Sequence, residues 1–168
     1  MSLLVRNLIF TAVVPGAGAV YGPWWILTRG GASPTPTAWP AVAVIVVGAA
    51  GYLWCLWMFA TVGRGTPGPW DAPRRVVAVG PYRWVRNPMY LSALLVVLGE
   101  TWLFLSLPLL LYTGALAVLV VLFVIGYEEP TLRCRFGESY VQYRRAVPGG
   151  FLADRALDQP RCPVSARC

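Results

Sequence analysis

Long apolar stretches separated by short polar segments make up most of this chain. The run from Pro88 to Tyr127 contains one charged residue, Glu100, and is long enough to cross a membrane twice. Ser106-Leu-Pro108 lies in its middle, and the proline favours a break between two helices. The pattern predicts an all-α integral membrane protein with about four transmembrane helices, the last two forming a helical hairpin, at about residues 8–27, 40–62, 88–106 and 108–127.

The polar segments complete this outline. Residues 63–79 form a connection rich in Gly and Pro, which we expect to fold back over the membrane surface. Residues 131–147 have apolar positions near helical spacing and predict a C-terminal amphipathic surface helix, with Gly137 as its weak point. The glycines and alanines of 48–51 offer a small-residue face for close helix packing. No stretch remains to build a separate core, so residues 1–168 are expected to form a single integral membrane domain.

Composition and charge support a membrane protein and set its expected orientation. Of the 168 residues, 57% are hydrophobic and 12% are charged, and the net charge is +7. All 14 basic residues are Arg, and most cluster beside apolar segments, in 63–87 and after 131. This favours a membrane surface over nucleic acid as their partner, and the positive-inside rule places both termini and these two segments in the cytoplasm. The lack of Lys beside abundant Ala, Gly and Val is typical of a GC-rich bacterial genome, and hence indicates a bacterial inner membrane.

The metal-ligating residue types predict no metal site. The chain has no His, and its four cysteines show no CxxC or zinc-like spacing. A Cys/His metal centre is therefore not expected, and the cysteines receive no functional assignment.

The chemistry-bearing residues concentrate in two short stretches that the predicted topology brings to one membrane surface. The first is Gly80–Tyr90, which holds two arginines, and the second is the pair Glu128-Glu129. Arginines bind a carboxylate or phosphate, carboxylates accept from an ammonium or from sugar hydroxyls, and aromatic faces attract a cation such as a sulfonium. S-adenosylmethionine carries all of these groups, and an anionic lipid headgroup carries some of them.

Each of these residues also has a purely structural interpretation. The arginines suit membrane anchoring and the aromatic residues suit the interfacial belt. Asn87-Pro88 suits a helix start, because Asn is a good N-cap and Pro is favoured at the first helical position. Glu128 and Glu129 are harder to explain in this way. At the end of an apolar span they oppose the helix dipole and need cationic partners, which the arginines across the hairpin can supply.

An ordered set of motifs runs through the second half of the chain. It consists of Gly80-Pro-Tyr-Arg, Arg86-Asn-Pro-Met-Tyr90, the apolar hairpin, Glu128-Glu129, Phe136-Gly-Glu-Ser-Tyr140, and Tyr143 followed by Val147-Pro148. From Gly80 to Pro148 the chain resembles the isoprenylcysteine carboxyl methyltransferase family and its relative phosphatidylethanolamine N-methyltransferase. The resemblance implies a small helical membrane enzyme that transfers a methyl group from S-adenosylmethionine to a lipophilic or membrane-embedded small acceptor at the cytoplasmic face.

The resemblance also implies roles for individual residues. The cofactor would be bound in a cytoplasmic region of residues 80–90 and 128–148, by Gly80, Tyr82, Arg86, Asn87, Pro88, Tyr90, Glu128 and Glu129. Asn87 stands where the family motif usually has His, and an amide cannot transfer a proton near pH 7. Ser92 replaces a common Gly two positions after the tyrosine. We expect both departures to affect which acceptor is methylated more than whether the cofactor is bound.

Catalysis needs residues that align the reactants, exclude water and, for some acceptors, remove a proton. The candidates are Arg86, Glu129 and Glu100, which lies within the third span, where ionisable residues are by default functional candidates. Two other functions remain open: an NAD(P)H-dependent membrane reductase of the sterol-reductase type, whose C-terminal half is related, and a non-catalytic membrane protein that binds lipid. The acceptor group and the oligomeric state also remain open.

Overall fold

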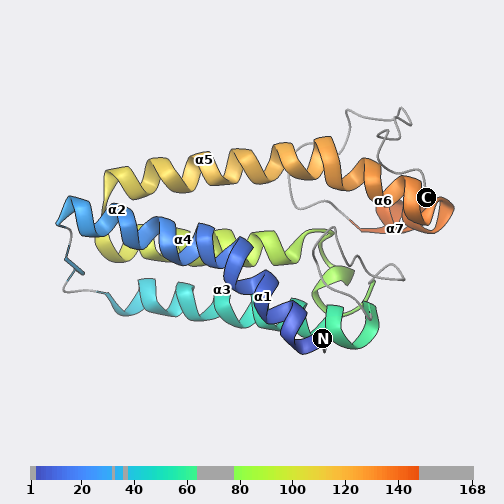
Figure 1. Ribbon diagram of the computed structural model, residues 1–168, viewed down its shortest axis with the longest axis horizontal. Coiled ribbons are helices and arrows are strands. Elements are labelled where there is room, and N and C mark those ends of the chain that lie inside the picture. Colours follow the sequence, from blue (N-terminus) through green and yellow to red (C-terminus); the bar gives the residue numbers. More distant parts are fainter. Residues whose placement is uncertain (1–2, 32, 36–37, 64–77, 148–168) are drawn as a thin grey trace.

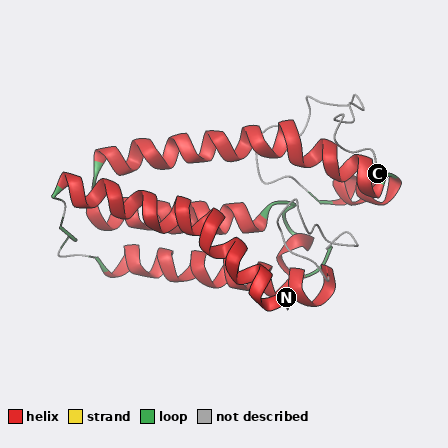
Figure 2. Cartoon of the chain, viewed as in Figure 1, coloured by secondary structure: helices red, strands yellow, loops and turns green. Residues whose placement is uncertain are grey.

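The computed structural model describes residues 3–31, 33–35, 38–63 and 78–147, and most of these residues are helical. Long helices run side by side along one axis, and the smaller helices gather at one end of the bundle (Figure 1). The part of the chain within these ranges contains helices and turns and no strand (Figure 2). The expected all-α architecture is confirmed.

The first long helix consists of α1 (Leu3–Gly16), a π-helical turn η1 (Ala17–Tyr21) and α2 (Gly22–Gly30). A proline inside a regular helix clashes with the carbonyl group four residues earlier. For Pro23 that carbonyl belongs to Ala19, at the centre of η1. The wider π-turn accommodates the proline, so the helix bends without breaking (Figure 1).

The second helix, α3 (Trp39–Met58), ends in another π-helical turn, η2 (Phe59–Gly63). The chain re-enters the described part just before a 3₁₀ turn, η4 (Gly80–Arg83), and then begins α4 (Pro88–Phe104). The connection that was predicted to fold back over the membrane lies mostly outside the described residues.

Glycines bring α3 and α4 into close contact. A Cβ atom added at Gly48 would lie 2.8 Å from the backbone oxygen of Ser92, and one added at Gly51 would lie 2.7 Å from the Ser92 hydroxyl. On the opposite helix, a Cβ at Gly99 would lie 2.6 Å from Cγ1 of Ile45. Real Cβ atoms essentially never approach so closely, and backbone atoms are among the neighbours at Gly48 and Gly99, so a larger side chain at these two positions would force the helices apart. The predicted packing role of the small residues is confirmed at Gly48 and Gly51.

The break predicted in the long apolar run is present. Leu105 has a positive φ of 46°, which ends α4, and Ser106 is the N-cap of α5 (Leu107–Phe123). The Ser106 hydroxyl accepts a hydrogen bond from a first-turn backbone N–H at 3.4 Å. The buried hydroxyls of Thr101 and Thr113 lie 2.8 Å apart and join the two helices near this turn.

The helix that begins with α5 does not stop before the acidic pair. It continues through a π-helical turn, η5 (Val124–Glu128), into α6 (Glu129–Phe136). Pro130 is again preceded by a π-turn around the residue four positions earlier, Gly126. The expected helix end at residue 127 is therefore wrong, and the two glutamates lie inside a helix rather than at its C-terminus.

The segment expected to form one amphipathic helix over 131–147 is divided. Gly137, with φ 55° and ψ −130°, separates α6 from α7 (Glu138–Ala146). This backbone conformation is accessible almost only to glycine, so it interrupts the helix and turns the chain. As a result α7 folds back beside α6 (Figure 1).

Within the described part of the chain, three helices are long and apolar enough to cross a membrane, namely Ile9–Gly30, Trp39–Gly63 and Leu107–Phe136. The helix Pro88–Phe104 is apolar but shorter. Its 17 residues correspond to about 26 Å, slightly less than the roughly 30 Å hydrocarbon core of a bilayer.

Candidate functional site

The η4 turn is seated on the end of α3. Gly80 has a positive φ of 59°, and a Cβ atom at this position would lie 3.2 Å from Sδ of Met58. Glycine is thus required both for the backbone conformation and for the close approach. The turn buries Tyr82, whose ring packs edge-on against Phe59 at a centroid distance of 5.5 Å.

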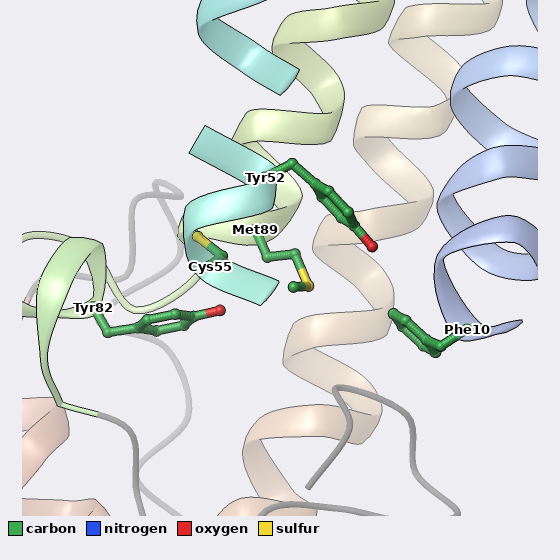
Figure 3. Close-up of a cluster of buried hydrophobic side chains, with 5 residues drawn as sticks. All are labelled: Phe10, Tyr52, Cys55, Tyr82 and Met89. Atoms are coloured by element: carbon green, nitrogen blue, oxygen red, sulfur yellow. The ribbon is translucent and has the colours of Figure 1, made fainter. Parts of the chain in front are cut away.

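Tyr82 joins a buried cluster that closes the inner side of the site (Figure 3). Its hydroxyl group donates to the thiol of Cys55, and its ring lies near Met89 at the start of α4. Burial raises the pKa of Tyr82 well above its usual value, so the phenol stays neutral. The remaining members of the cluster are Tyr52 on α3 and Phe10 on α1.

An ion pair joins the two predicted motifs. Nη1 of Arg86 donates to Oε1 of Glu129 at 2.8 Å. The Arg86 side chain is 3% exposed and the Glu129 side chain is 17% exposed. The pair therefore links the loop before α4 to the start of α6, where water screens the charges only weakly.

Asn87 and Pro88 lie beside this ion pair along the chain, and both are buried. Asn87 occupies the N-cap position of α4 and Pro88 the first helical position, as the sequence predicts. The Asn87 side chain, however, makes no capping hydrogen bond to the helix. Capping of α4 therefore does not explain why the Asn87 side chain is buried next to Arg86.

Glu128 occupies the neighbouring helical position and faces a different partner. The hydroxyl group of Tyr90 donates to its carboxylate. The ring of Tyr90 also packs edge-on against Phe123, with centroids 6.5 Å apart. Oε2 of Glu128 is buried and has no hydrogen-bond partner among the described residues. A buried carboxylate oxygen without a donor is rare in native structures and marks a position where a ligand can bind.

Two tyrosines of α7 complete the site. Both lie in the predicted cofactor region 128–148, but neither was named as a site residue. The hydroxyl group of Tyr143 donates to the backbone oxygen of Tyr82 at 2.8 Å, which ties α7 to η4. Burial raises the pKa of Tyr143 to about 12, and the nearby Arg86 opposes this shift. Tyr140 is buried and hydrogen-bonded to Arg86, and burial raises its pKa. The sequence signal for both was present, since they belong to the ordered motif set.

The structure thus brings together eight of the predicted positions around one end of α4 and the start of α6: Gly80, Tyr82, Arg86, Asn87, Pro88, Tyr90, Glu128 and Glu129. Glu100 is not brought to them. It lies twelve residues after Pro88 in the same helix, which corresponds to about 18 Å along the helix axis. Its Oε2 atom is buried without a hydrogen-bond partner in the described part of the chain.

Comparison with known proteins identifies the family. A sequence model of the phospholipid methyltransferase family matches residues 37–139, more than half of the chain. The chain belongs to this family. Searches of curated proteins and of solved structures find no match. The match extends the motif resemblance, which began at Gly80, back through α3, and it ends just before Tyr140.

Membership of the phospholipid methyltransferase family gives the geometry a chemical meaning. The matched region contains α3, η4, α4, α5 and α6, and therefore both the Arg86–Glu129 ion pair and Glu128. The family transfers methyl groups, so a site at one end of an apolar helical bundle suits a membrane methyltransferase. The first helix, residues 3–30, lies outside the match.

Proposed function

We propose that this protein is an S-adenosylmethionine-dependent methyltransferase that acts on a lipophilic acceptor at the cytoplasmic face of a bacterial inner membrane. The observation that carries the proposal is the buried Oε2 atom of Glu128, which lies beside the Arg86–Glu129 ion pair and has no donor among the described residues. A carboxylate in this state attracts an ammonium group or a hydroxyl donor.

The residues present fit the groups of this cofactor. Glu128 can accept from its ammonium group or ribose hydroxyls, and the ring of Tyr90 offers an aromatic face beside that carboxylate. The ion pair of Arg86 and Glu129 is neutral as a whole, so Glu128 adds a negative charge that favours a cation. When bound, S-adenosylmethionine supplies an electrophilic methyl group on its sulfonium sulfur. The anionic phosphates of NADPH suit the same carboxylate poorly, which disfavours the reductase alternative.

The chain's own contribution to the reaction is positioning and exclusion of water. Arg86 and Glu129 hold the α4 entry against α6, and Tyr143 holds α7 against η4. We assign the catalytic roles to Arg86 and Glu129, which would act together as an ion pair that fixes the geometry of the site. Glu100 is not assigned a role in this reaction because of its distance from these residues. Asn87 is a neutral amide and supplies hydrogen bonds without proton transfer.

Orientation follows from the arginines. The η4 turn, α6 and α7 lie at one end of the bundle, and the C-terminal end of α2 lies at the other end (Figure 1). The first group of elements carries Arg83 and the arginines of α6 and α7, and Arg86 follows η4, whereas Arg29 belongs to the last turn of α2. We infer that α4 crosses the bilayer as a fourth span and that the site end faces the cytoplasm. A lipophilic acceptor would then enter laterally between helices, and the cofactor would enter from the aqueous side.

Binding of the demethylated cofactor tests the proposal directly. Full-length protein in lipid nanodiscs should bind S-adenosylhomocysteine, measured by isothermal titration calorimetry, and should not bind NADPH. Glu128→Gln keeps the acceptor for Tyr90 but removes the second carboxylate oxygen, so we expect at least about tenfold weaker binding, equal to about 1.4 kcal/mol. Glu138→Gln, at an exposed position of α7, is the matched control and should leave the affinity unchanged.

Two outcomes would contradict the proposal. Tight NADPH binding without S-adenosylhomocysteine binding would favour the reductase. Equal behaviour of Glu128→Gln and Glu138→Gln would favour a lipid-binding protein without a cofactor. Incubation of the protein with labelled S-adenosylmethionine and a membrane extract should in turn label a lipid-soluble product, and a base-labile label would indicate an ester.

A further inference from the structure

Asn7 on α1 is an unpaired polar side chain inside the protein. It is 3% exposed, and neither Nδ2 nor Oδ1 has a hydrogen-bond partner among the described residues. A buried amide without partners destabilises a fold, because both its donors and its acceptor have lost water. Native structures rarely retain such a group unless a ligand or another function requires it.

The position of Asn7 relates it to the proposed methyl-transfer site. Asn7, Phe10 and Thr11 are three and four residues apart and therefore share one face of α1. Phe10 belongs to the buried cluster with Tyr82 and Met89 (Figure 3), and the Thr11 hydroxyl lies 3.1 Å from that of Tyr52. Asn7 lies one turn nearer the end of the bundle that carries the site, where α1 contacts η2.

The charge of the side chains near Asn7 determines which chemical groups its amide can hydrogen-bond. Among the described residues, the side chains of η2, those of Asn7, Phe10 and Thr11 on α1, and those of the buried cluster are uncharged. A charged headgroup would be costly to bury there without a counter-ion. An amide, by contrast, offers both a donor and an acceptor to a neutral group that has the same capacity.

We propose that Asn7 determines acceptor specificity by hydrogen-bonding an uncharged polar headgroup, a hydroxyl or a carboxamide, carried on an apolar chain. This inference rests on the proposed methyltransferase function. The apolar chain would lie along the lipid-facing bundle, and the headgroup would satisfy the amide between α1 and η2. Because the family match begins at residue 37, Asn7 belongs to a part of this chain that the family's shared pattern does not include.

Equilibrium binding of simple amphiphiles tests this role. Full-length protein in nanodiscs is titrated with tritiated 1-dodecanol and dodecanamide, with empty nanodiscs as the partition blank and dodecanoate and dodecylamine as charged controls. We expect saturable binding of the two neutral probes. Asn7→Leu should weaken that binding at least tenfold and leave S-adenosylhomocysteine binding within twofold. It should also raise the midpoint of thermal unfolding, because it removes an unpaired buried amide.

Thr11→Val is the control for disturbed helix packing. It removes the contact with Tyr52, so it should lower the unfolding midpoint and leave dodecanol binding unchanged. The inference is overturned if wild-type protein binds neither neutral probe, if Asn7→Leu binds them normally, or if Asn7→Leu lowers the midpoint as loss of a structural hydrogen bond would. Loss of S-adenosylhomocysteine binding in Asn7→Leu would also overturn it. Failure of the wild type to bind S-adenosylhomocysteine would instead overturn the proposed function, whatever the neutral probes show.

Discussion

The guanidinium group of Arg86 lies almost completely out of water, and the carboxylate of Glu129 balances its charge. Removing one partner of such a pair leaves an uncompensated buried charge, whereas replacing both by apolar groups is often neutral. We therefore expect Glu129→Leu to lower the free energy of unfolding by about 2–4 kcal/mol. The double variant Arg86→Met/Glu129→Leu should recover most of this loss.

The measurement is denaturant-induced unfolding in mixed micelles, followed by circular dichroism. Both variants should lose binding of S-adenosylhomocysteine. The double variant should therefore be nearly as stable as the wild type and still fail to bind this ligand. A double variant as unstable as Glu129→Leu alone would contradict this account, and would indicate that other contacts of Arg86 dominate its contribution.

For individual residues, the sequence predicted that the Gly80–Tyr90 stretch and the Glu128-Glu129 pair lie close together. It did not predict which glutamate pairs with Arg86. Consecutive helical residues point about 100° apart, so only one of two adjacent glutamates can face a given arginine. The structure selects Glu129 for Arg86 and leaves Glu128 to Tyr90. That choice depends on the rotation of α6 about its own axis, which the packing of the whole bundle determines and no local motif records.

Among the elements, the turn between α6 and α7 controls whether the C-terminal tyrosines reach the site. Gly137 adopts φ 55° and ψ −130°, and a Cβ atom there would meet nothing within 4 Å. Gly137→Ala should therefore act through backbone strain alone and destabilise the protein by about 1–3 kcal/mol. Strain at this turn should also loosen Tyr143 from Tyr82 and weaken S-adenosylhomocysteine binding.

Gly126→Ala is the matched control. Gly126 also has open space around its missing Cβ, but it lies in the helical turn η5 without a positive φ. An alanine there should be neutral or stabilising by up to about 1 kcal/mol. Thermal unfolding of the two variants side by side checks the prediction, and equal effects would show that φ at Gly137 is not what matters.

The elements also show where sequence patterns mislead. Apolar length located the hairpin and its break correctly, because lipid requires helices of a minimum length. The acidic pair followed by Pro130 resembled a helix end, yet the helix continues to Phe136. A π-turn of five residues, Val124–Glu128, removes the clash that proline would otherwise cause. The same arrangement occurs upstream of Pro23, so at these two prolines the helix widens and continues instead of ending.

In the whole molecule, the site is assembled from segments far apart in the chain at one end of the bundle. Charge asymmetry predicted this convergence, because it placed the arginine-rich segments on one side of a membrane. The proposed contribution of the first helix was not predicted, since Asn7 becomes noticeable only when its burial and its lack of hydrogen-bond partners among the described residues are known. The sequence of an apolar helix does not show whether a single polar side chain in it faces the protein interior or the lipid.

The proposed orientation depends on whether α4 crosses the bilayer, although it is shorter than the other long helices. A short span is tolerated when the bilayer thins or its ends are covered by polar residues, at a modest cost. If α4 crosses, positions on its two sides must face different compartments. Ser33 and Leu107, which are exposed beyond α2 and at the start of α5, should then be external. Val79, exposed just before η4, should be cytoplasmic.

Single-cysteine labelling of the full-length chain decides the question. In a background with all four native cysteines replaced by alanine, Ser33→Cys and Leu107→Cys should react with a membrane-impermeant maleimide in spheroplasts. Val79→Cys should react only after lysis, because the probe cannot reach the cytoplasm. Reaction of Leu107→Cys and Val79→Cys from the same side would show that α4 does not cross. In that case the orientation assigned by the positive-inside rule would be wrong.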